Sequence, residues 1–229
     1  MDTTFGSVSY RSVGEINAAM GRVYFHMMLA VLTSMVVSYW VGSSAALMQF
    51  FFTGWTKWVV IFAPLVAVFV VVMAINANPP RPVAIGLLHG FAALMGLSFA
   101  TIFAVYVMSS IVGAFMGAAV LFGVMSLYGY FTKQSLDSIG KYCLVALIAI
   151  VIASIINVFL GSTWLQQVIS AIAIVVFLGL TAYDTQKIRE QVSVEGNTDA
   201  PEILGALSLY LDFINIFLSL LQLFGERKE

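Results

Sequence analysis

Two acidic residues lie inside strongly apolar segments of the chain. Asp184 lies in residues 180–187 (LTAYDTQK), and Asp212 lies in residues 209–215 (LYLDFIN). A charged side chain near the centre of a bilayer costs at least about 2.5 kcal/mol, so an intramembrane carboxylate is a functional candidate by default. Asp212 is the stronger candidate, because its apolar segment holds no basic residue that could neutralise it.

Two such carboxyl groups facing each other would share one site of low dielectric constant. They cannot both ionise at low energetic cost, so we expect Asp184 and Asp212 to hold a single proton and to sense pH near neutrality. Their oxygens also suit calcium, although a pair supplies too few ligands for tight binding. Weak binding favours conduction, because an ion must also leave. The alternative for Asp184 is a helix-end carboxylate paired with Lys187 or Arg189.

Polar residues continue along one face of the segment that carries Asp212. They recur at spacings of three and four, which places them on one helical stripe: Gly205, Ser208, Asp212, Asn215, Ser219 and Gln222. A polar stripe in a bilayer must face protein or water. We therefore expect this helix near the centre of a bundle, with Ser208, Asn215 and Ser219 lining an ion path. A hydrogen-bonded packing seam is an equally good explanation.

The composition requires a membrane environment for most of the chain. Of the 229 residues, 61% are hydrophobic and 9% are charged, and the mean hydropathy is +1.01. A soluble domain has about 25% charged residues, so this chain lacks the charge to cover a water-facing surface. The single cysteine, Cys143, excludes an intrachain disulfide, and the net charge of −1 argues against a nucleic-acid partner. The sequence suggests no cofactor.

Seven segments are long and apolar enough to cross a bilayer as helices, which takes about 20 apolar residues each. The sequence therefore predicts an all-α polytopic membrane protein with a polar N-terminal arm (1–22), a seven-helix domain (23–224) and a charged C-terminal end (225–229). The predicted helices cover residues 23–41, 58–75, 84–107, 109–131, 142–160, 165–188 and 203–224.

Basic residues predict the orientation, because cationic loops stay in the cytoplasm. Seven crossings place seven basic residues on the side of the N-terminus and three on the other side, which predicts a cytoplasmic N-terminus and an external C-terminus. If the last helix did not cross, the division would be nine against one. The first set is Arg11, Arg22, Arg81, Lys133, Lys141, Lys187 and Arg189, and the second is Lys57, Arg227 and Lys228.

The first six predicted helices form two groups of three. When a group with an odd number of helices is duplicated, the two copies insert into the membrane in opposite orientations. Two such groups and one additional helix are typical of an inverted-repeat fold. Small residues are expected where helices touch, because they let backbones approach closely. They recur in the third and fourth predicted helices, at Gly86, Gly90, Ala93 and Ala100, and at Gly113 and Gly117.

The segments around the two aspartates resemble one known family. Residues 180–187 (LTAYDTQK) and 206–215 (ALSLYLDFIN) resemble the transmembrane Bax inhibitor motif family, which includes Bax inhibitor-one and its bacterial relatives. Residues 126–133 (SLYGYFTK) look like the segment after the fourth helix in the bacterial branch, and residues 96–98 (GLS) fit as well. The similarity spans nearly the whole chain, and the segment around Asp212 is its most specific part.

The resemblance implies a central last helix and a pH-sensitive calcium leak across a bacterial inner membrane. In that family, aspartates of the sixth and seventh helices form the pH-sensing pair, which falls on Asp184 and Asp212. Family members also carry a basic residue near the end of the second helix that bonds to the pair in one state. Residues 76–80 (NANPP) depart from that pattern, and Arg81 follows them directly. Arg81 is a candidate partner of the pair, and the favoured alternative is a basic loop residue that only sets the orientation. Bacterial relatives are linked to a membrane-anchored AAA protease, as inhibitor or substrate.

Three functions compete at this stage. A proton-gated calcium leak and a non-conducting regulator of another membrane protein, such as that protease, are not separated by the sequence. An intramembrane aspartyl protease also uses aspartates on neighbouring helices, but the Gly-x-Gly-Asp motif is absent before Asp212 and the C-terminal Pro-Ala-Leu signature is missing. We therefore expect a transport or regulatory protein and not an enzyme.

Overall fold

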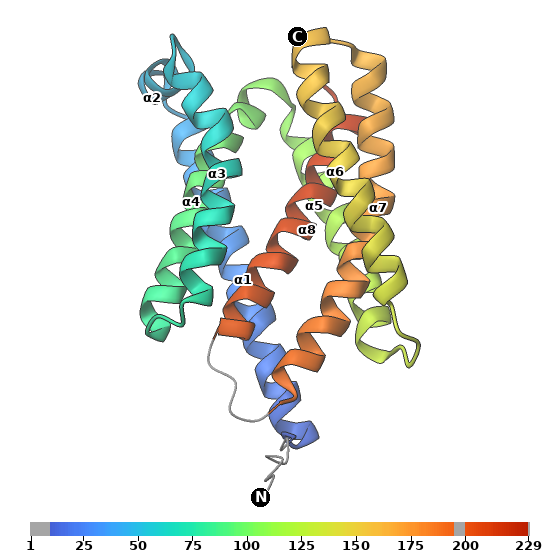
Figure 1. The fold of residues 1–229 in the computed structure, drawn as a ribbon. Coiled ribbons are helices and arrows are strands. Elements are labelled where there is room, and N and C mark those ends of the chain that lie inside the picture. The colour runs from blue at the N-terminus through green and yellow to red at the C-terminus, as the bar shows by residue number, and fades with distance from the viewer. Residues whose placement is uncertain (1–9, 195–199, 229) are drawn as a thin grey trace, which may run out of the picture.

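The computed structural model describes residues 10–194 and 200–228. That part of the chain forms eight helices joined by short connections (Figure 1). They are α1 (Val13–Gly42), α2 (Ala45–Phe52), α3 (Thr56–Asn76), α4 (Arg81–Val105), α5 (Met108–Phe131), α6 (Asp137–Leu160), α7 (Thr163–Val192) and α8 (Ala200–Phe224).

Seven of these helices, all except α2, are long and apolar enough to cross a membrane. The predicted all-α fold with seven membrane helices is therefore confirmed, and each predicted segment overlaps one observed helix. The sequence analysis does not predict α2. With 8 residues α2 is too short to span a bilayer. Its N-cap residue is Ser44, whose hydroxyl accepts a hydrogen bond from the backbone N–H of Leu47.

α1 begins at Val13, well before residue 23, where its predicted apolar segment starts. Ser12 and Glu15 form a capping box, in which each side chain accepts a hydrogen bond from the backbone N–H of the other residue. Residues 13–22 of the predicted polar arm are therefore the first turns of a membrane helix. The serine and the glutamate three residues later are visible in the sequence and mark this start.

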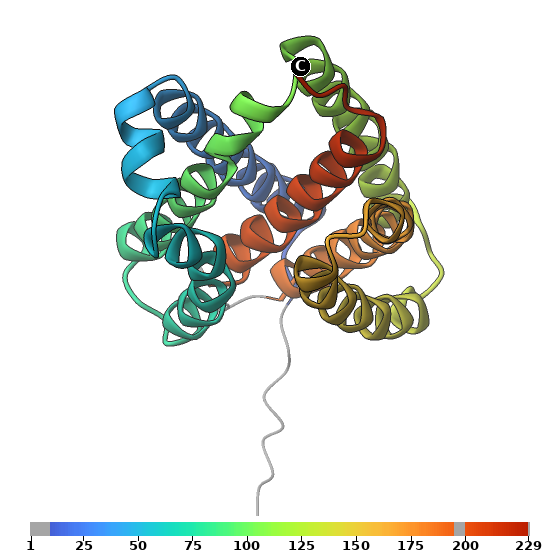
Figure 2. The same cartoon turned by 90° about the horizontal axis from the view of Figure 1, so that it is seen from above.

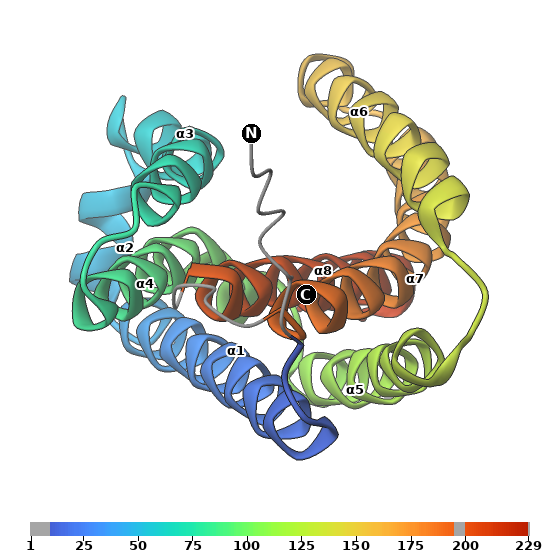
Figure 3. The same ribbon diagram turned by 60° about the horizontal axis from the view of Figure 1, so that its bottom comes forward.

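α8 lies at the centre of the bundle. Figure 3 shows it passing between two groups of helices, one formed by α1, α3 and α4 and the other by α5, α6 and α7, and Figure 2 shows the same arrangement from above. In the most apolar part of α8, 67% of the residues are buried, against 6% in α6. Protein therefore surrounds α8, whereas α6 lies at the periphery.

The two groups of helices pack in the same order. α4 contacts both α1 and α3, and α7 contacts both α5 and α6. α8 contacts all three helices of the first group, α1, α3 and α4, and it contacts α5 and α7 of the second. α1 and α5 run in opposite directions along the bundle (Figure 1). An inverted repeat would produce this arrangement, and the repeat itself stays a hypothesis.

Close helix contacts do not occur at most of the glycines that the sequence analysis singles out. A methyl group would meet no atom within 4 Å at three of them, Gly86, Gly90 and Gly113. At Gly96, by contrast, a methyl carbon would lie 2.5 Å from the carbonyl oxygen of Ser34 in α1. The close approach of α4 to α1 therefore depends on Gly96. The predicted helix contacts at Gly86, Gly90 and Gly113 are wrong, because these glycines face outward.

The C-terminal end pairs with the connection between α4 and α5. The backbone N–H of Val107 donates to the carbonyl of Glu226 at 3.1 Å, and the N–H of Lys228 donates to the carbonyl of Val105 at 2.8 Å. This pairing holds the end of α8 against the turn between α4 and α5. No charged residue marks that turn in the sequence.

Candidate functional site

α7 and α8 pack antiparallel along most of their length. Near one end of the pair, a methyl group added at Gly205 would meet Ile188 at 2.8 Å. Near the other end, the Ser170 hydroxyl donates to the Gln222 side chain at 2.8 Å. The polar stripe of α8 therefore faces α7. α7 continues to Val192, beyond its predicted end at residue 188, so it covers the first half of α8 as well.

Asp212 lies in the middle of this interface and is 4% exposed. The Thr181 hydroxyl of α7, which donates to the carbonyl of Phe177 at 2.7 Å, lies beside its carboxyl group, and a second acid, Asp184, is its charged neighbour across the interface. One of its carboxyl oxygens, Oδ2, is covered and has no hydrogen-bond partner within residues 10–194 and 200–228. A carboxylate buried in this way is unfavourable unless it takes up a proton or a cation.

Asp184 lies about one turn beyond Thr181 on α7 and borders a cavity of about 350 Å³. The walls of this cavity come from α7, α8 and Val72 of α3, and its polar lining includes Ser208 of the predicted stripe together with Lys187. Asp184 is therefore the charged neighbour of the covered Asp212 and also borders a space lined by polar side chains.

The two cations considered as helix-end partners of Asp184 bind elsewhere. The ammonium of Lys187 lies 2.8 Å from the carboxylate of Asp137 in α6. The guanidinium of Arg189 donates to the carbonyl of Tyr130 at 3.0 Å and lies 4.9 Å from the centre of its ring. Among the described residues, no ion pair supports the interpretation of Asp184 as a structural helix-end carboxylate.

Arg81, the candidate basic partner of the aspartates, lies beside a third acid. Its guanidinium is 3.4 Å from the carboxylate of Glu202, in the first turn of α8. Arg22 of α1 donates to the same carboxylate through two nitrogens, at 2.5 and 2.9 Å. In this structure Arg81 therefore neutralises the start of α8. The sequence analysis missed Glu202, although an acid in the first turn of a helix is favoured by the helix dipole.

The far end of the polar stripe, at Gln222, hydrogen-bonds to α7. The Gln222 side chain accepts a hydrogen bond from Gln166 of α7 at 2.5 Å. Asn215 donates to a carbonyl of its own helix at 2.8 Å, and Ser219 is buried. Of the three residues predicted to line a path, Ser208 borders a cavity, whereas Asn215 and Ser219 lie in the packed half of the interface.

Asp184 and Asp212 supply few ligand atoms for a metal ion. Within the described residues, no group of three or more His, Cys, Asp or Glu side chains could hold one. Asp184 and Asp212, with the hydroxyls of Thr181 and Ser208 beside them, offer oxygen ligands of the kind that calcium prefers. Two carboxylates are too few for a tight site, so this arrangement suits a cation that is held briefly.

Comparisons with known proteins agree with the resemblance seen in the sequence. Residues 16–229 match the family described as Inhibitor of apoptosis-promoting Bax1. The chain is 40% identical over 214 residues to the inner membrane protein YbhL of Escherichia coli (strain K12), which covers 91% of this chain and 92% of that protein. It is 36% identical over 211 residues to an uncharacterized protein of Rickettsia prowazekii, with 91% and 89% covered.

A third relative is the uncharacterized protein YrjE of Lactococcus lactis, 37% identical over 221 residues, with 92% of this chain and 91% of that protein covered. The family match over residues 16–229 includes both aspartate segments. With seven helices fit to cross a membrane, the chain is an integral membrane protein and belongs to the Bax inhibitor-1 family.

Proposed function

We propose that this protein is a pH-sensitive leak channel for calcium ions, gated by the pair Asp184 and Asp212. The observation that carries the proposal is the environment of Asp212, a covered acid with one unpartnered oxygen and a second acid as its charged neighbour. Such a pair favours one shared proton. We also propose that the protein works in the bacterial inner membrane, as the name of its Escherichia coli relative indicates, with its N-terminus in the cytoplasm.

The proposed mechanism uses the position of the pair between two helices. With one proton shared, the two carboxyl groups attract each other and hold α7 against α8. Loss of that proton leaves two like charges in a site of low dielectric constant, which favours separation of the helices or entry of a cation. Protons and calcium ions then compete for the same oxygens, so the leak depends on pH.

The proposed path for the ion follows the polar stripe of α8. Ser208 borders the cavity beside Asp184, so a cation reaches the pair from that cavity. Beyond the pair, Asn215 and Ser219 lie in the closed half of the α7–α8 interface. Conduction therefore requires this half to open, which links the charge of the pair to the width of the path.

Calcium flux into liposomes tests the proposal. The liposomes contain the purified protein and an enclosed calcium-sensitive dye, and the flux is measured from about pH 6 to about pH 8, where a pair that shares a proton is expected to titrate. The wild-type protein should give a flux that changes with pH. Asp212→Asn and Asp184→Asn should each flatten this dependence, because neither variant has two acids that share a proton.

A matched control is Glu190→Gln, which removes an exposed acid of α7 that pairs with Lys187 at 2.9 Å. This control should leave the pH dependence unchanged. An unaltered flux and pH response in Asp212→Asn would overturn the proposal. A wild-type protein that passes no calcium at any pH would favour the alternative, a non-conducting regulator that binds or inhibits a membrane-anchored AAA protease.

A further inference from the structure

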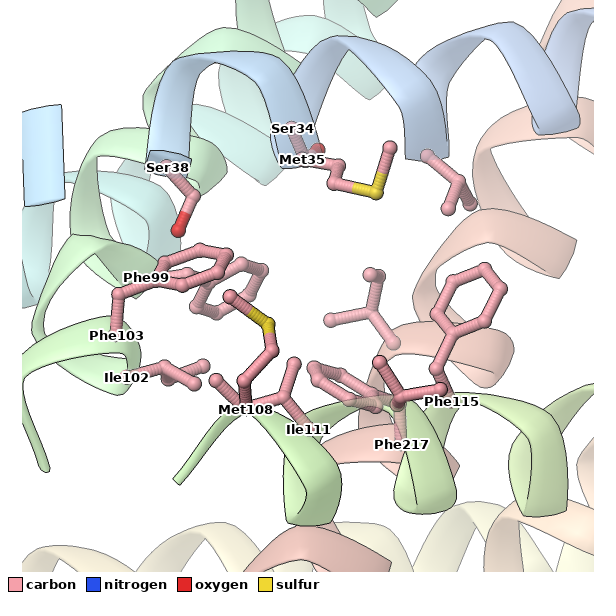
Figure 4. A pocket seen from close by; sticks show the side chains of 13 residues that line it. Ser34, Met35, Ser38, Phe99, Ile102, Phe103, Met108, Ile111, Phe115 and Phe217 are labelled. Atoms are coloured by element: carbon pink, nitrogen blue, oxygen red, sulfur yellow. The ribbon is translucent and has the colours of Figure 1, made fainter. Parts of the chain in front are cut away.

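A second cavity lies on the side of α8 that faces away from Asp212. It has a volume of about 200 Å³ and lies between α1, α4, α5 and α8 (Figure 4). α8 contributes Ile214 and Phe217, which face away from Asp212 because a helix turns by about 100° per residue. The remaining walls are mostly aromatic and aliphatic, and include Met35, Phe99, Phe103, Met108, Ile111 and Phe115.

Two hydroxyl groups reach this apolar cavity, and they differ in their hydrogen bonds. The Ser34 hydroxyl is 2.6 Å from the hydroxyl of Tyr210 and 2.9 Å from the carbonyl of Ala92. Ser38, about one turn farther along α1, is 3% exposed, and its hydroxyl makes no hydrogen bond within the part of the chain that the structure describes. Its oxygen is not fully covered, because it borders the open space of the cavity. Figure 4 shows the Ser38 oxygen pointing into the cavity.

The missing partner of Ser38 is informative, because a hydroxyl that faces an almost entirely apolar cavity without a hydrogen bond is unfavourable. A serine or threonine in a helix often avoids this by donating to the carbonyl one turn back. Thr33 and Ser34 do so, at 2.8 and 3.1 Å. Ser38 instead keeps its hydroxyl available for a molecule inside the cavity.

The volume of the cavity limits the size of that molecule. An apolar cavity of about 150 Å³ binds one benzene molecule. The volume of about 200 Å³ found here therefore accommodates one aromatic ring with a short alkyl chain. Water suits the cavity poorly, because an ordered water needs two to four polar partners and these walls are almost entirely apolar.

The side chains at the edge of the cavity indicate how a ligand would enter. Met35, Met108 and Val112 line the cavity, yet they are 46%, 53% and 54% exposed on the outer surface of α1 and α5. In a membrane helix this surface faces lipid. Methionine side chains are flexible and can move aside, so the entrance opens toward the bilayer and selects a lipid-soluble molecule.

We propose that this cavity binds a lipid-soluble small molecule with an aromatic ring or a short branched alkyl group and one hydroxyl or carbonyl group that hydrogen-bonds to Ser38. The site shares no residue with the aspartate pair, so the proposal stands independently of the calcium leak. Ser34, in the wall of the cavity, hydrogen-bonds to Tyr210 and so ties α1 to α8. An occupant therefore contacts the helix that carries Asp212.

Two probes that differ by one hydroxyl group test the proposal. The full-length protein in lipid nanodiscs is titrated by calorimetry with para-propylphenol and with propylbenzene. The wild-type protein should bind para-propylphenol about three- to tenfold more tightly, the amount expected from one added hydrogen bond. Ser38→Ala should abolish this preference and leave the affinity for propylbenzene unchanged.

Two further variants locate the binding. Ser38→Met fills the cavity and should abolish binding of both probes. Val59→Met, at a 49% exposed position of α3, is the matched control and should bind both as the wild type does. If Ser38→Met does not fold, Ser38→Ala decides alone, because it removes a single atom.

Several outcomes would overturn the proposal. Equal affinity of the wild-type protein for the two probes would show that Ser38 does not take part. Binding that survives in folded Ser38→Met would place the probes elsewhere. Binding in detergent that disappears in nanodiscs would mean that lipid acyl chains fill the cavity.

Discussion

Glu202 and Asp212 lie on the same central helix and are equally buried, each 4% exposed, yet they have opposite surroundings. Glu202 lies within 3.4 Å of two arginines, Arg22 of α1 and Arg81 of α4. Asp212 faces a third acid, Asp184 of α7. At one end of α8, an acid is thus neutralised by two arginines. In the middle of α8, an acid has another acid as its charged neighbour.

The difference separates a structural acid from a responsive one. A carboxylate bound by two guanidinium groups stays ionised and holds three helices together. A carboxylate whose charged neighbour is another acid has no stable fully ionised state in a dry interface, so it responds to protons and cations. The first group of helices therefore anchors α8, and the second, through α7, carries its response.

The largest expected effect on stability is that of Glu202→Gln. This change leaves two arginines without their carboxylate and should lower the free energy of unfolding by about 2–3 kcal/mol. The effect should lie near the lower end of the range for breaking a buried ion pair, because the Arg22 side chain is 44% exposed. Denaturant unfolding of the purified protein measures it. The control Glu190→Gln, on an exposed pair, should change stability by less than about 0.5 kcal/mol. Equal effects of the two changes would remove the anchor role of Glu202.

The two arginines should contribute unequally. Arg22→Gln removes two charge-assisted hydrogen bonds of 2.5 and 2.9 Å and should destabilise the protein by about 2 kcal/mol. Arg81→Gln, with a contact of 3.4 Å, should cost about 0.5 kcal/mol. The same unfolding experiment compares them. A larger loss for Arg81→Gln, reversed by Asp212→Asn in the double variant, would instead make Arg81 a partner of the aspartate pair.

The predicted effect at the aspartate pair has the opposite sign. Asp212→Asn keeps the shape of the side chain but removes a buried acid that faces another acid, so it should stabilise the protein by about 1 kcal/mol. Unfolding of this variant at neutral pH, beside Glu202→Gln, gives the comparison directly. Destabilisation of similar size in both variants would mean that Asp212, like Glu202, stabilises the fold as an ionised acid.

The sequence predicts the parts of this arrangement that depend on local pattern. Seven apolar segments give seven helices, and the position of Asp184 and Asp212 inside two of them follows from the same pattern. The spacing of polar residues on α8 correctly indicates a central helix. Each of these properties is set by residues within a few turns of one another.

Properties that depend on distant segments were not predictable. Nothing in the sequence shows that the starts of α4 and α8 meet near Arg22, so Arg81 is assigned to the aspartates in the sequence analysis and lies beside Glu202 in the structure. Small size alone does not say which way Gly86 or Gly113 faces. The cavity at Ser38 needs four helices to form, and no local pattern marks it.

Infrared spectroscopy of the carboxyl groups tests the central claim most directly, because it distinguishes a protonated carboxyl from a carboxylate. At neutral pH the wild-type protein should show one protonated carboxyl group, which both Asp212→Asn and Asp184→Asn remove and which Glu202→Gln leaves in place. A wild-type spectrum without a protonated carboxyl, or a signal that survives in both aspartate variants, would contradict the account of two acids that share one proton.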